Sequence, residues 1–231
     1  MERKKTKTIA IDGPARSGKT TIAKLISKKT GFLYLNTGAL YRAIAIYVIQ
    51  NNIDLTTNDE LVKSLSNIEI TVEYNNSQQI TFLNGKNVTD KVNTDLTSDY
   101  ASRVSSVNEV REKLINLQRD LANQYNLVIE GRDIGTNVIP DAFLKIYLDA
   151  NVEERALRRY TQYKQSYLEQ NKDIKELTEE LQIRDKRDKT RPISPLRPDI
   201  DSIIIDTTNK SIKQVLNIIL KEFNKKEGLI C

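Results

Sequence analysis

One stretch of this chain decides its fold: Gly13-Pro14-Ala15-Arg16-Ser17-Gly18-Lys19-Thr20. Its glycines allow a tight turn in which consecutive backbone N–H groups point at phosphate oxygens, and the N-terminus of a following helix adds partial positive charge. Lys19 is placed to reach the β- and γ-phosphates of a nucleotide, and Thr20 is placed to offer its hydroxyl to Mg²⁺. The stretch therefore predicts a binding site for a nucleoside triphosphate, made of Gly13, Pro14, Ala15, Arg16, Ser17, Gly18, Lys19, Thr20 and Thr21.

The sequence on either side of this loop supports that interpretation. Residues 8–11 are a short run typical of a buried strand, and residues 21–26 carry apolar side chains at helical spacing. A strand, a glycine-rich turn and a helix thus follow one another in the order that phosphate binding requires. The alternative is a glycine turn that only joins a strand to a helix, and such a turn does not need the Gly-Lys-Thr ending.

Composition excludes several classes of site. The 231 residues contain no histidine, and Cys231 is the sole cysteine, so a Ser-His-Asp triad, a histidine-bound zinc and an internal disulfide are all unavailable. No apolar run is long enough to cross a bilayer, and no cleavable apolar segment follows the basic start, so we expect a cytoplasmic protein without a membrane partner. The net charge of +5 is compatible both with nucleic acid and with arginines around phosphorylated ligands.

The alternation of apolar segments predicts a single α/β unit. Strand-like runs occur at residues 32–35, 127–129, 144–148 and 203–205, and helical patterns occur at residues 40–50, 110–123, 152–169, 177–187 and 212–223. This order is typical of a doubly wound, five-stranded parallel sheet with helices on both faces. In such folds ligands bind at the carboxyl ends of the strands, which is where the glycine-rich loop lies.

One segment departs from this pattern. Between residues 67 and 88, apolar and polar residues alternate on both sides of Asn75-Asn76-Ser77, which predicts an antiparallel insertion. We expect a small subdomain at about residues 54–106, apart from the parallel sheet, with a core made of residues 1–53 and 107–231.

Three further charged motifs are candidates for ligand binding. Residues 36–42 and 130–136 follow the second and third strands of the predicted sheet, so a hydroxyl, arginines and a carboxylate lie at the ligand-binding edge. In residues 184–191, the spacing of Arg184, Asp188 and Arg191 can place all three on one helix face. Each motif also has a structural alternative: Thr37 as a helix N-cap, a turn with an Arg-Asp ion pair, and a solvated helix end.

A fourth cluster, Arg155, Arg158 and Arg159, lies on the helix predicted at residues 152–169. These arginines can close over a transferring phosphoryl group or form solvated surface, and the sequence does not choose between the two.

Together these motifs resemble the bacterial cytidylate kinases, a family of P-loop nucleoside monophosphate kinases. The resemblance runs from the glycine-rich loop through residues 37–42 and 130–136 to residues 184–188, which is nearly the whole chain. It implies transfer of the γ-phosphoryl group of ATP to CMP or dCMP, with Mg²⁺ as cofactor, a nucleotide-binding insertion at residues 54–106 and a lid at about residues 153–170. It also implies a monomer that binds no nucleic acid.

The resemblance also assigns roles to single residues. Catalysis is assigned to Lys19, Arg132, Asp133, Arg158 and Arg159, and Thr20 is the metal ligand. The cytosine is expected against Thr37, Arg111, Asp133 and Arg191, the sugar against Ser102, Arg184 and Asp188, and the acceptor phosphate against Arg42 and Arg132. The chain departs from the family pattern at Thr37, where serine is common, at Glu130, where aspartate is frequent, and at Arg16, a bulky cation inside the loop.

Two other functions share parts of this pattern. A kinase of another small acceptor, such as shikimate or a different nucleotide, would have the same loop and sheet. A nucleic-acid-binding or regulatory ATPase would use the basic surface, but only 6% of the residues are aromatic and no stacking residues interleave with the cations.

Overall fold

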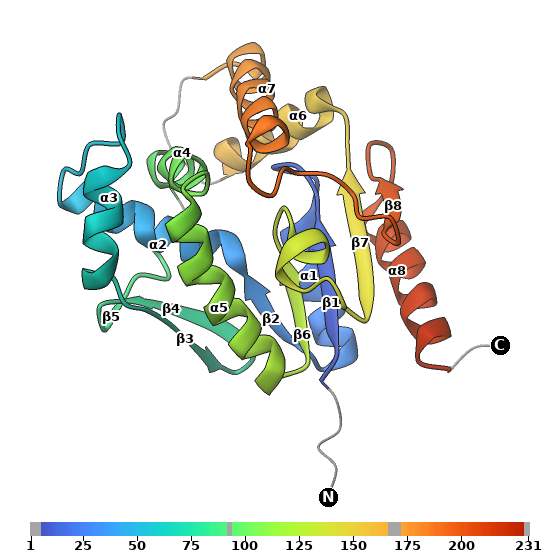
Figure 1. The fold of residues 1–231 in the computed structure, drawn as a ribbon. Coiled ribbons are helices and arrows are strands. Elements are labelled where there is room, and N and C mark those ends of the chain that lie inside the picture. The colour runs from blue at the N-terminus through green and yellow to red at the C-terminus, as the bar shows by residue number, and fades with distance from the viewer. Residues whose placement is uncertain (1–5, 92–93, 166–171, 229–231) are drawn as a thin grey trace, which may run out of the picture.

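A five-stranded parallel sheet forms the centre of the molecule (Figure 1). The computed structural model describes residues 6–91, 94–165 and 172–228. The strands of this sheet lie in the order β2-β6-β1-β7-β8 and are all parallel. Their bounds are β1 Thr8–Asp12, β2 Leu33–Asn36, β6 Leu127–Glu130, β7 Leu144–Asp149 and β8 Ile203–Asp206. The predicted α/β class and each of the five predicted strands are confirmed.

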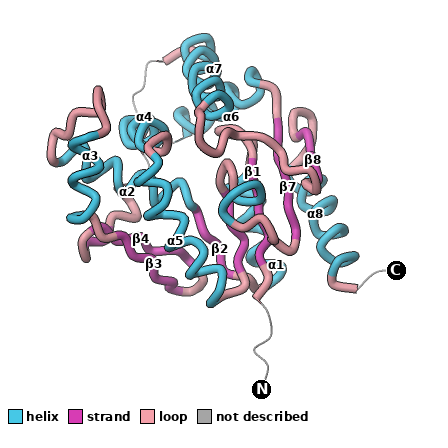
Figure 2. Tube along the Cα trace, viewed as in Figure 1, coloured by secondary structure: helices cyan, strands magenta, loops and turns pink. Residues whose placement is uncertain are grey.

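Helices connect these strands and cover both faces of the sheet (Figure 2). The helices are α1 Lys19–Thr30, α2 Thr37–Gln50, α3 Asp59–Ser64, α4 Asp95–Val104, α5 Asn108–Gln124, α6 Val152–Gln165, α7 Ile174–Thr190 and α8 Ile212–Lys226, with short turns η1 Leu65–Asn67 and η2 Ile134–Val138. The helical patterns found in the sequence are confirmed, although α2 and α7 begin three residues earlier than predicted. Residues 166–169 of the helix predicted from 152 lie outside the described residues.

Two apolar layers hold the sheet between its helices. On one face, Ile9 and Ile11 of β1 pack with Ile22 and Ile26 of α1 and with Ile219 of α8. On the other face, Ala10 and Leu35 pack with residues of α5 and η2, including Leu121 and Val138. Because successive side chains of a strand point to opposite faces, a run such as 9–11 serves both layers, and a strand buried on both faces reads as continuously apolar.

The insertion forms a separate antiparallel sheet, as the alternation of residues 67–88 predicted. Its strands are β3 Ile70–Asn75, β4 Gln78–Leu83 and β5 Lys86–Asn87, in the order β3-β4-β5. This sheet packs on α2 through a cluster that includes Ile70, Leu83 and Leu40. A side-chain hydrogen bond also links it to the edge of the parallel sheet, since the backbone N–H of Asn36 donates to Gln79 Oε1 at 2.7 Å. The insertion therefore supports α2, which leads away from the ligand-binding edge.

Helices α6 and α7 lie above the carboxyl ends of the parallel strands (Figure 1). They pack on each other through a small apolar cluster that contains Ala156, Leu177 and Leu181, with Ala15 of the glycine-rich loop as its contact with the core. The edge of the sheet that carries the predicted ligand residues is thus enclosed from above. Among the described residues, no helix combines the length and apolar character needed to span a membrane.

The packing of α2 generates a prediction about stability. Leu40 is fully buried between the insertion and α5, whereas Leu96 on α4 is 56% exposed. We expect Leu40→Ala to lower the free energy of unfolding by about 2–5 kcal/mol, because it leaves a cavity that the cluster cannot fill. Urea denaturation of both variants tests this, and a Leu96→Ala variant that loses as much stability would contradict it.

Candidate active site

The glycine-rich loop, residues 13–20, joins β1 to α1 and has the backbone that the motif requires. Gly13 has φ 145°, and a Cβ there would lie 2.0 Å from the carbonyl oxygen of Leu148 on β7. Gly18 has φ 93° and precedes the first residue of α1. Both positions therefore demand glycine, Gly13 for space and for conformation and Gly18 for conformation. Arg16 also adopts the left-handed region, at φ 66°, so this loop holds a cation in a conformation that favours glycine.

The side chain of Lys19 closes the loop. Its Nζ donates to the carbonyl oxygen of Pro14 at 2.5 Å, so the amine lies inside the turn that its own backbone completes. Burial lowers the pKa of Lys19 well below its usual value, and the positive charge of Arg132 lowers it further, against the opposing effect of Glu130. Lys19 is thus a desolvated cation in surroundings that a phosphate would complete.

Arginines of α6 hold the loop from above. Arg155 donates to the carbonyl oxygen of Ala15 at 3.2 Å, and Arg158 donates to that of Arg16 at 3.5 Å and to that of Thr207 at 2.8 Å. Arg16 in turn donates to Gln162 of α6. The helix that carries the predicted lid arginines is therefore hydrogen-bonded to the glycine-rich loop at several points.

Thr20 and Glu130 form a pair of oxygen-bearing side chains beside Lys19. The hydroxyl of Thr20 donates to Glu130 Oε1 at 2.8 Å, and the same carboxylate accepts from the hydroxyl of Tyr34. A hydroxyl and a carboxylate are ligands that suit Mg²⁺, which usually takes one or two protein oxygens and fills its octahedron with water and substrate phosphates. Among the described residues no group of three His, Cys, Asp or Glu side chains that could hold a metal ion occurs.

Asp12 is a buried carboxylate that the sequence analysis did not assign to the site. Its Oδ1 accepts from the backbone N–H of Ile134 at 2.9 Å, and its Oδ2 accepts from that of Gly135 at 2.8 Å. Asp12 thereby fixes the start of η2 to the end of β1. Burial raises the pKa of Asp12 to about 6, although the two amide donors lower it. The sequence offered one signal for this role, namely that Asp12 is a carboxylate placed between an apolar strand and the glycine-rich loop.

A buried network lies on the other side of β6. Asp133 follows that strand and accepts from two guanidinium groups: Arg111 Nη2 of α5 contacts its Oδ2, and Arg191 Nη2 lies 3.1 Å from its Oδ1. We call these three residues the acceptor network. Arg111 is only 1% exposed, so its charge depends on this carboxylate for compensation. The network connects three segments that are far apart in the sequence.

More guanidinium groups lie between this network and the loop. Arg132 Nε pairs with Asp188 at 2.9 Å. Burial opposes the charge of Arg132, but Asp188 outweighs this and raises its pKa. Burial and the nearby charge of Arg132 lower the pKa of Arg184 to about 10, and the opposing charge of Asp188 does not restore it. The buried Nε atoms of Arg42 and Arg184 have no hydrogen-bond partner among the described residues.

Thr37 and Ser102 complete the polar lining. The side chain of Asn36, and not that of Thr37, caps α2 by accepting from the N–H of Ala39, so the N-cap alternative for Thr37 is wrong. Thr37 instead donates to the carbonyl oxygen of Glu130 at 2.8 Å. The Oγ of Ser102 on α4 is buried and has no partner within the described part of the chain.

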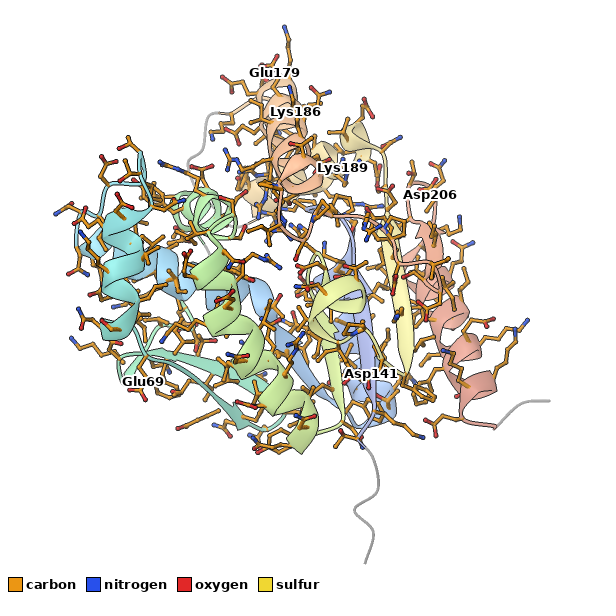
Figure 3. The ribbon with its side chains drawn as sticks, viewed as in Figure 1. Glu69, Asp141, Glu179, Lys186, Lys189 and Asp206 are labelled. Carbon is orange, nitrogen blue, oxygen red and sulfur yellow. The ribbon has the colours of Figure 1, made fainter. Side chains whose placement is uncertain are left out.

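One cavity of about 1210 Å³ brings these groups together. The predicted residues that line it are Ala15, Arg16, Ser17, Gly18, Lys19, Thr20, Thr21, Thr37, Arg42, Ser102, Arg111, Arg132, Asp133, Arg158, Arg184, Asp188 and Arg191. In the charged motif at residues 184–191, Lys186 and Lys189 do not line the cavity and are exposed on α7 (Figure 3). The spacing of Arg184, Asp188 and Arg191 has thus brought those three residues to one cavity.

Three predicted residues do not line the cavity. Gly13 and Pro14 form the base of the glycine-rich loop, where Gly13 packs on β7 and Pro14 accepts from Lys19. Arg159 points toward α7, pairs with Glu180 at 3.0 Å and donates to the hydroxyl of Tyr163. Of the basic cluster on α6, only Arg158 is therefore in the lining, since Arg155 is buried in an ion pair with Asp185 at 2.6 Å.

Comparison with known proteins agrees with this geometry. The sequence model of the family described as "Cytidylate kinase" matches residues 9–225. The chain belongs to the cytidylate kinase family. A cytidylate kinase of Caldicellulosiruptor saccharolyticus is 45% identical over 95% of this chain and 96% of its own length. That of Bacillus subtilis is 41% identical over 98% and 99%, and that of Fusobacterium nucleatum is 43% identical over 94% and 97%.

The buried Asp12 predicts a pH dependence. Between pH 3.8, the usual pKa of an aspartate, and about 6, the folded chain holds a proton that the unfolded chain has lost. The contribution of Asp12 to stability is therefore present below about pH 4 and declines as the pH rises through 6. We expect the free energy of unfolding of the parent minus that of Asp12→Asn to fall over this window. Urea titrations at several pH values test the sign.

A control separates this effect from general acid sensitivity. Asp120 is an exposed carboxylate on α5 that, unlike Asp12, is in contact with solvent. The difference between the parent and Asp120→Asn should change much less over the same window. A difference for Asp12→Asn that rises with pH would contradict the burial of its carboxyl group.

Proposed function

We propose that this chain transfers the γ-phosphoryl group of ATP to the phosphate of CMP or dCMP, yielding ADP and CDP or dCDP. The observation that supports this most is that one cavity is lined by the glycine-rich loop on one side and by the acceptor network on the other. Such an arrangement suits two nucleotides bound with their phosphates facing one another. Membership of the cytidylate kinase family favours cytidine nucleotides over shikimate or another small acceptor.

ATP would bind on the side of the glycine-rich loop. The backbone N–H groups of residues 13–20 and the N-terminus of α1 suit phosphate oxygens, and Lys19 would contact the β- and γ-phosphates. The hydroxyl of Thr20 and the carboxylate of Glu130 would hold Mg²⁺, directly or through water. When bound, Mg²⁺ would neutralise negative charge on the phosphates.

CMP would bind on the side of the acceptor network. Asp133 and Arg191, with Thr37 and Arg111, would recognise the cytosine, and a carboxylate suits the exocyclic amino group because it accepts hydrogen bonds only. Ser102, Arg184 and Asp188 would contact the sugar, and Arg42 and Arg132 the acceptor phosphate. Within the described part of the chain, the buried atoms Ser102 Oγ, Arg42 Nε and Arg184 Nε have no hydrogen-bond partner, which supports this because buried polar groups usually have one.

Phosphoryl transfer does not require a covalent intermediate with the protein. An oxygen of the CMP phosphate attacks the γ-phosphorus of ATP, and the bond to the β-γ bridging oxygen breaks as ADP leaves. Lys19, Arg132 and Arg158 would stabilise the charge on the equatorial oxygens, which explains why a chain without histidine is sufficient. The catalytic roles of Asp133 and of Arg159 remain predictions, and Arg159 pairs with Glu180 in this structure.

We propose the same domain division as the sequence suggested: one kinase unit with its core at residues 1–53 and 107–231, a nucleotide-binding insertion at about 54–106 and a lid at about 153–170. The separate sheet β3-β4-β5 supports the insertion. The contacts of α6 with the glycine-rich loop support a lid there, although residues 166–170 lie outside the described part of the chain. The monomeric state and the cytoplasmic location stay predictions.

Replacing Lys19 tests the phosphate site. We expect Lys19→Ala to lower kcat by about 10²–10³-fold, the loss usual for removal of one preorganised electrostatic donor. Its far-UV circular dichroism should match that of the parent. Lys28→Ala removes an exposed lysine from the last turn of the same helix and is the matched control. Coupled-enzyme measurement of ADP release provides kcat, and a Lys19→Ala enzyme with the parent rate would refute the assignment.

The acceptor is tested by a panel of substrates. We expect kcat/KM to be highest for CMP or dCMP among CMP, dCMP, UMP, AMP and shikimate, each offered with ATP and Mg²⁺. The physical reason is that uracil presents a carbonyl oxygen to Asp133 where cytosine presents an amino group. Preference for an acceptor without cytosine would overturn the proposed function, and so would phosphoryl transfer to none of them.

A further inference from the structure

A buried lysine of the parallel sheet, Lys145, does not line the cavity but contacts two segments that lead to the acceptor network. Lys145 belongs to β7, its side chain is 7% exposed, and its neighbour across the sheet is Ala10 of β1. Its Nζ lies 2.5 Å from Asp199 Oδ2 and 2.9 Å from Asp201 Oδ1. These two hydrogen-bonded ion pairs raise the pKa of Lys145 although burial opposes its charge. A lysine in the interior of a sheet thus reaches outward to a pair of acids.

The stem of Lys145 supports the turn that follows Asp133. A Cβ on Gly135 would lie 3.2 Å from Cδ and 3.3 Å from Cγ of Lys145, so backbone and stem are in close contact. Gly135 belongs to η2, which begins directly after Asp133. Asp12 holds the same turn through the amides of Ile134 and Gly135. Lys145 and Asp12 therefore meet the turn at the same place and set its height above the sheet.

The ammonium group of Lys145 holds a second segment. We call residues 191–202 the strap; it runs from the end of α7 across to β8 (Figure 1). The strap begins with Arg191, whose Nη2 pairs with Asp133 and whose Nε donates to the carbonyl oxygen of Ser194 at 2.7 Å. Toward its other end it carries Asp199 and Asp201, the two partners of Lys145.

One side chain thus contacts the two segments that carry the Asp133–Arg191 ion pair: the turn after Asp133 and the strap that begins with Arg191. We propose that Lys145 is a positioning residue for the acceptor nucleotide: it fixes the distance between Asp133 and Arg191 by supporting the turn behind the first and by anchoring the strap that carries the second. This rests on the proposed function, which places the cytosine against Asp133 and Arg191.

The strength of this effect follows from the geometry of recognition. A donor and an acceptor that must meet a planar base lose most of their hydrogen-bond energy when the angle or distance is wrong. Asp133 holds the strap at Arg191, and the Lys145 anchor holds its far end at Asp199 and Asp201, just before the strap joins β8, which pairs with β7. Release of that anchor should loosen the position of Arg191 while the glycine-rich loop, held by α6, stays in place.

Lys145→Met is a clean test of the anchor. Methionine keeps an unbranched apolar stem beside Gly135 and removes the ammonium group, with its charge and its hydrogen-bond donors. The acids it abandons are reachable by water, since the side chains of Asp199 and Asp201 are 25% and 57% exposed, so no buried charge is left without a partner. Asp201→Asn, an exposed change at the other end of the anchor, is a second variant that poses little risk to folding.

We expect Lys145→Met to raise KM for CMP about tenfold, or ~1.4 kcal/mol, and to lower the ratio of kcat/KM for CMP to that for UMP. KM for ATP should stay within about twofold of the parent. Asp201→Asn should shift the same quantities in the same direction by a smaller factor. Lys7→Met is the matched control, since it breaks a partly buried lysine pair with Glu227 that is remote from the cavity.

The proposal is overturned if Lys145→Met lowers thermal stability as Lys7→Met does and leaves KM for CMP and the CMP-to-UMP ratio unchanged. It is also overturned if KM for CMP and for ATP rise equally, because that describes a general loss of structure. Asp133→Asn, measured in parallel, distinguishes failure of the positioning role from failure of the proposed acceptor site. If it changes CMP recognition while Lys145→Met does not, the positioning role alone fails; if it changes nothing, the assigned acceptor site fails.

Discussion

The carboxylate of Asp133 is the constraint on which the acceptor side of the molecule depends. Two buried guanidinium groups, those of Arg111 and Arg191, share it, and its negative charge compensates theirs at that depth. Because the three residues come from α5, the turn after β6 and the end of α7, this charge balance also fixes how three distant segments meet. Removing one partner would leave an uncompensated buried charge, which costs more than the pair contributes.

In the acceptor network a carboxylate balances the buried arginines. In the rest of the cavity the positive charge is only partly balanced. Burial lowers the pKa of Lys19, Arg42 and Arg184, and the charge of Arg132 adds to this in all three cases. Asp188 compensates Arg132 well enough to raise its pKa, but the same carboxylate does not restore that of Arg184. Phosphate groups supply the missing negative charge. A cavity that destabilises the charged form of its own lysine and arginines therefore favours binding of phosphorylated ligands.

The sequence predicted those features that depend on spacing along the chain. Glycines, Lys19 and Thr20 lie within eight residues, and the motifs at strand ends had to meet at one edge once the sheet was parallel. Features that depend on contacts between distant residues escaped it. Asp12 becomes informative only beside Gly135, and Lys145 only beside Asp199. The orientation of Arg159 could not be predicted either. Adjacent residues of a helix point in different directions, so Arg158 lines the cavity while Arg159 pairs with Glu180 of α7.

The end of β6 connects the two proposed nucleotide sites, and it fixes the distance between them. Glu130 faces Thr20 on the side of the glycine-rich loop, Arg132 pairs with Asp188 beside it, and Asp133 belongs to the acceptor network. Four consecutive residues therefore span from donor to acceptor. Phosphoryl transfer demands that attacking and leaving oxygens lie in line at a fixed distance. A rigid central strand, bonded to β1 on one side and to β2 on the other, meets that demand better than two sites joined through loops.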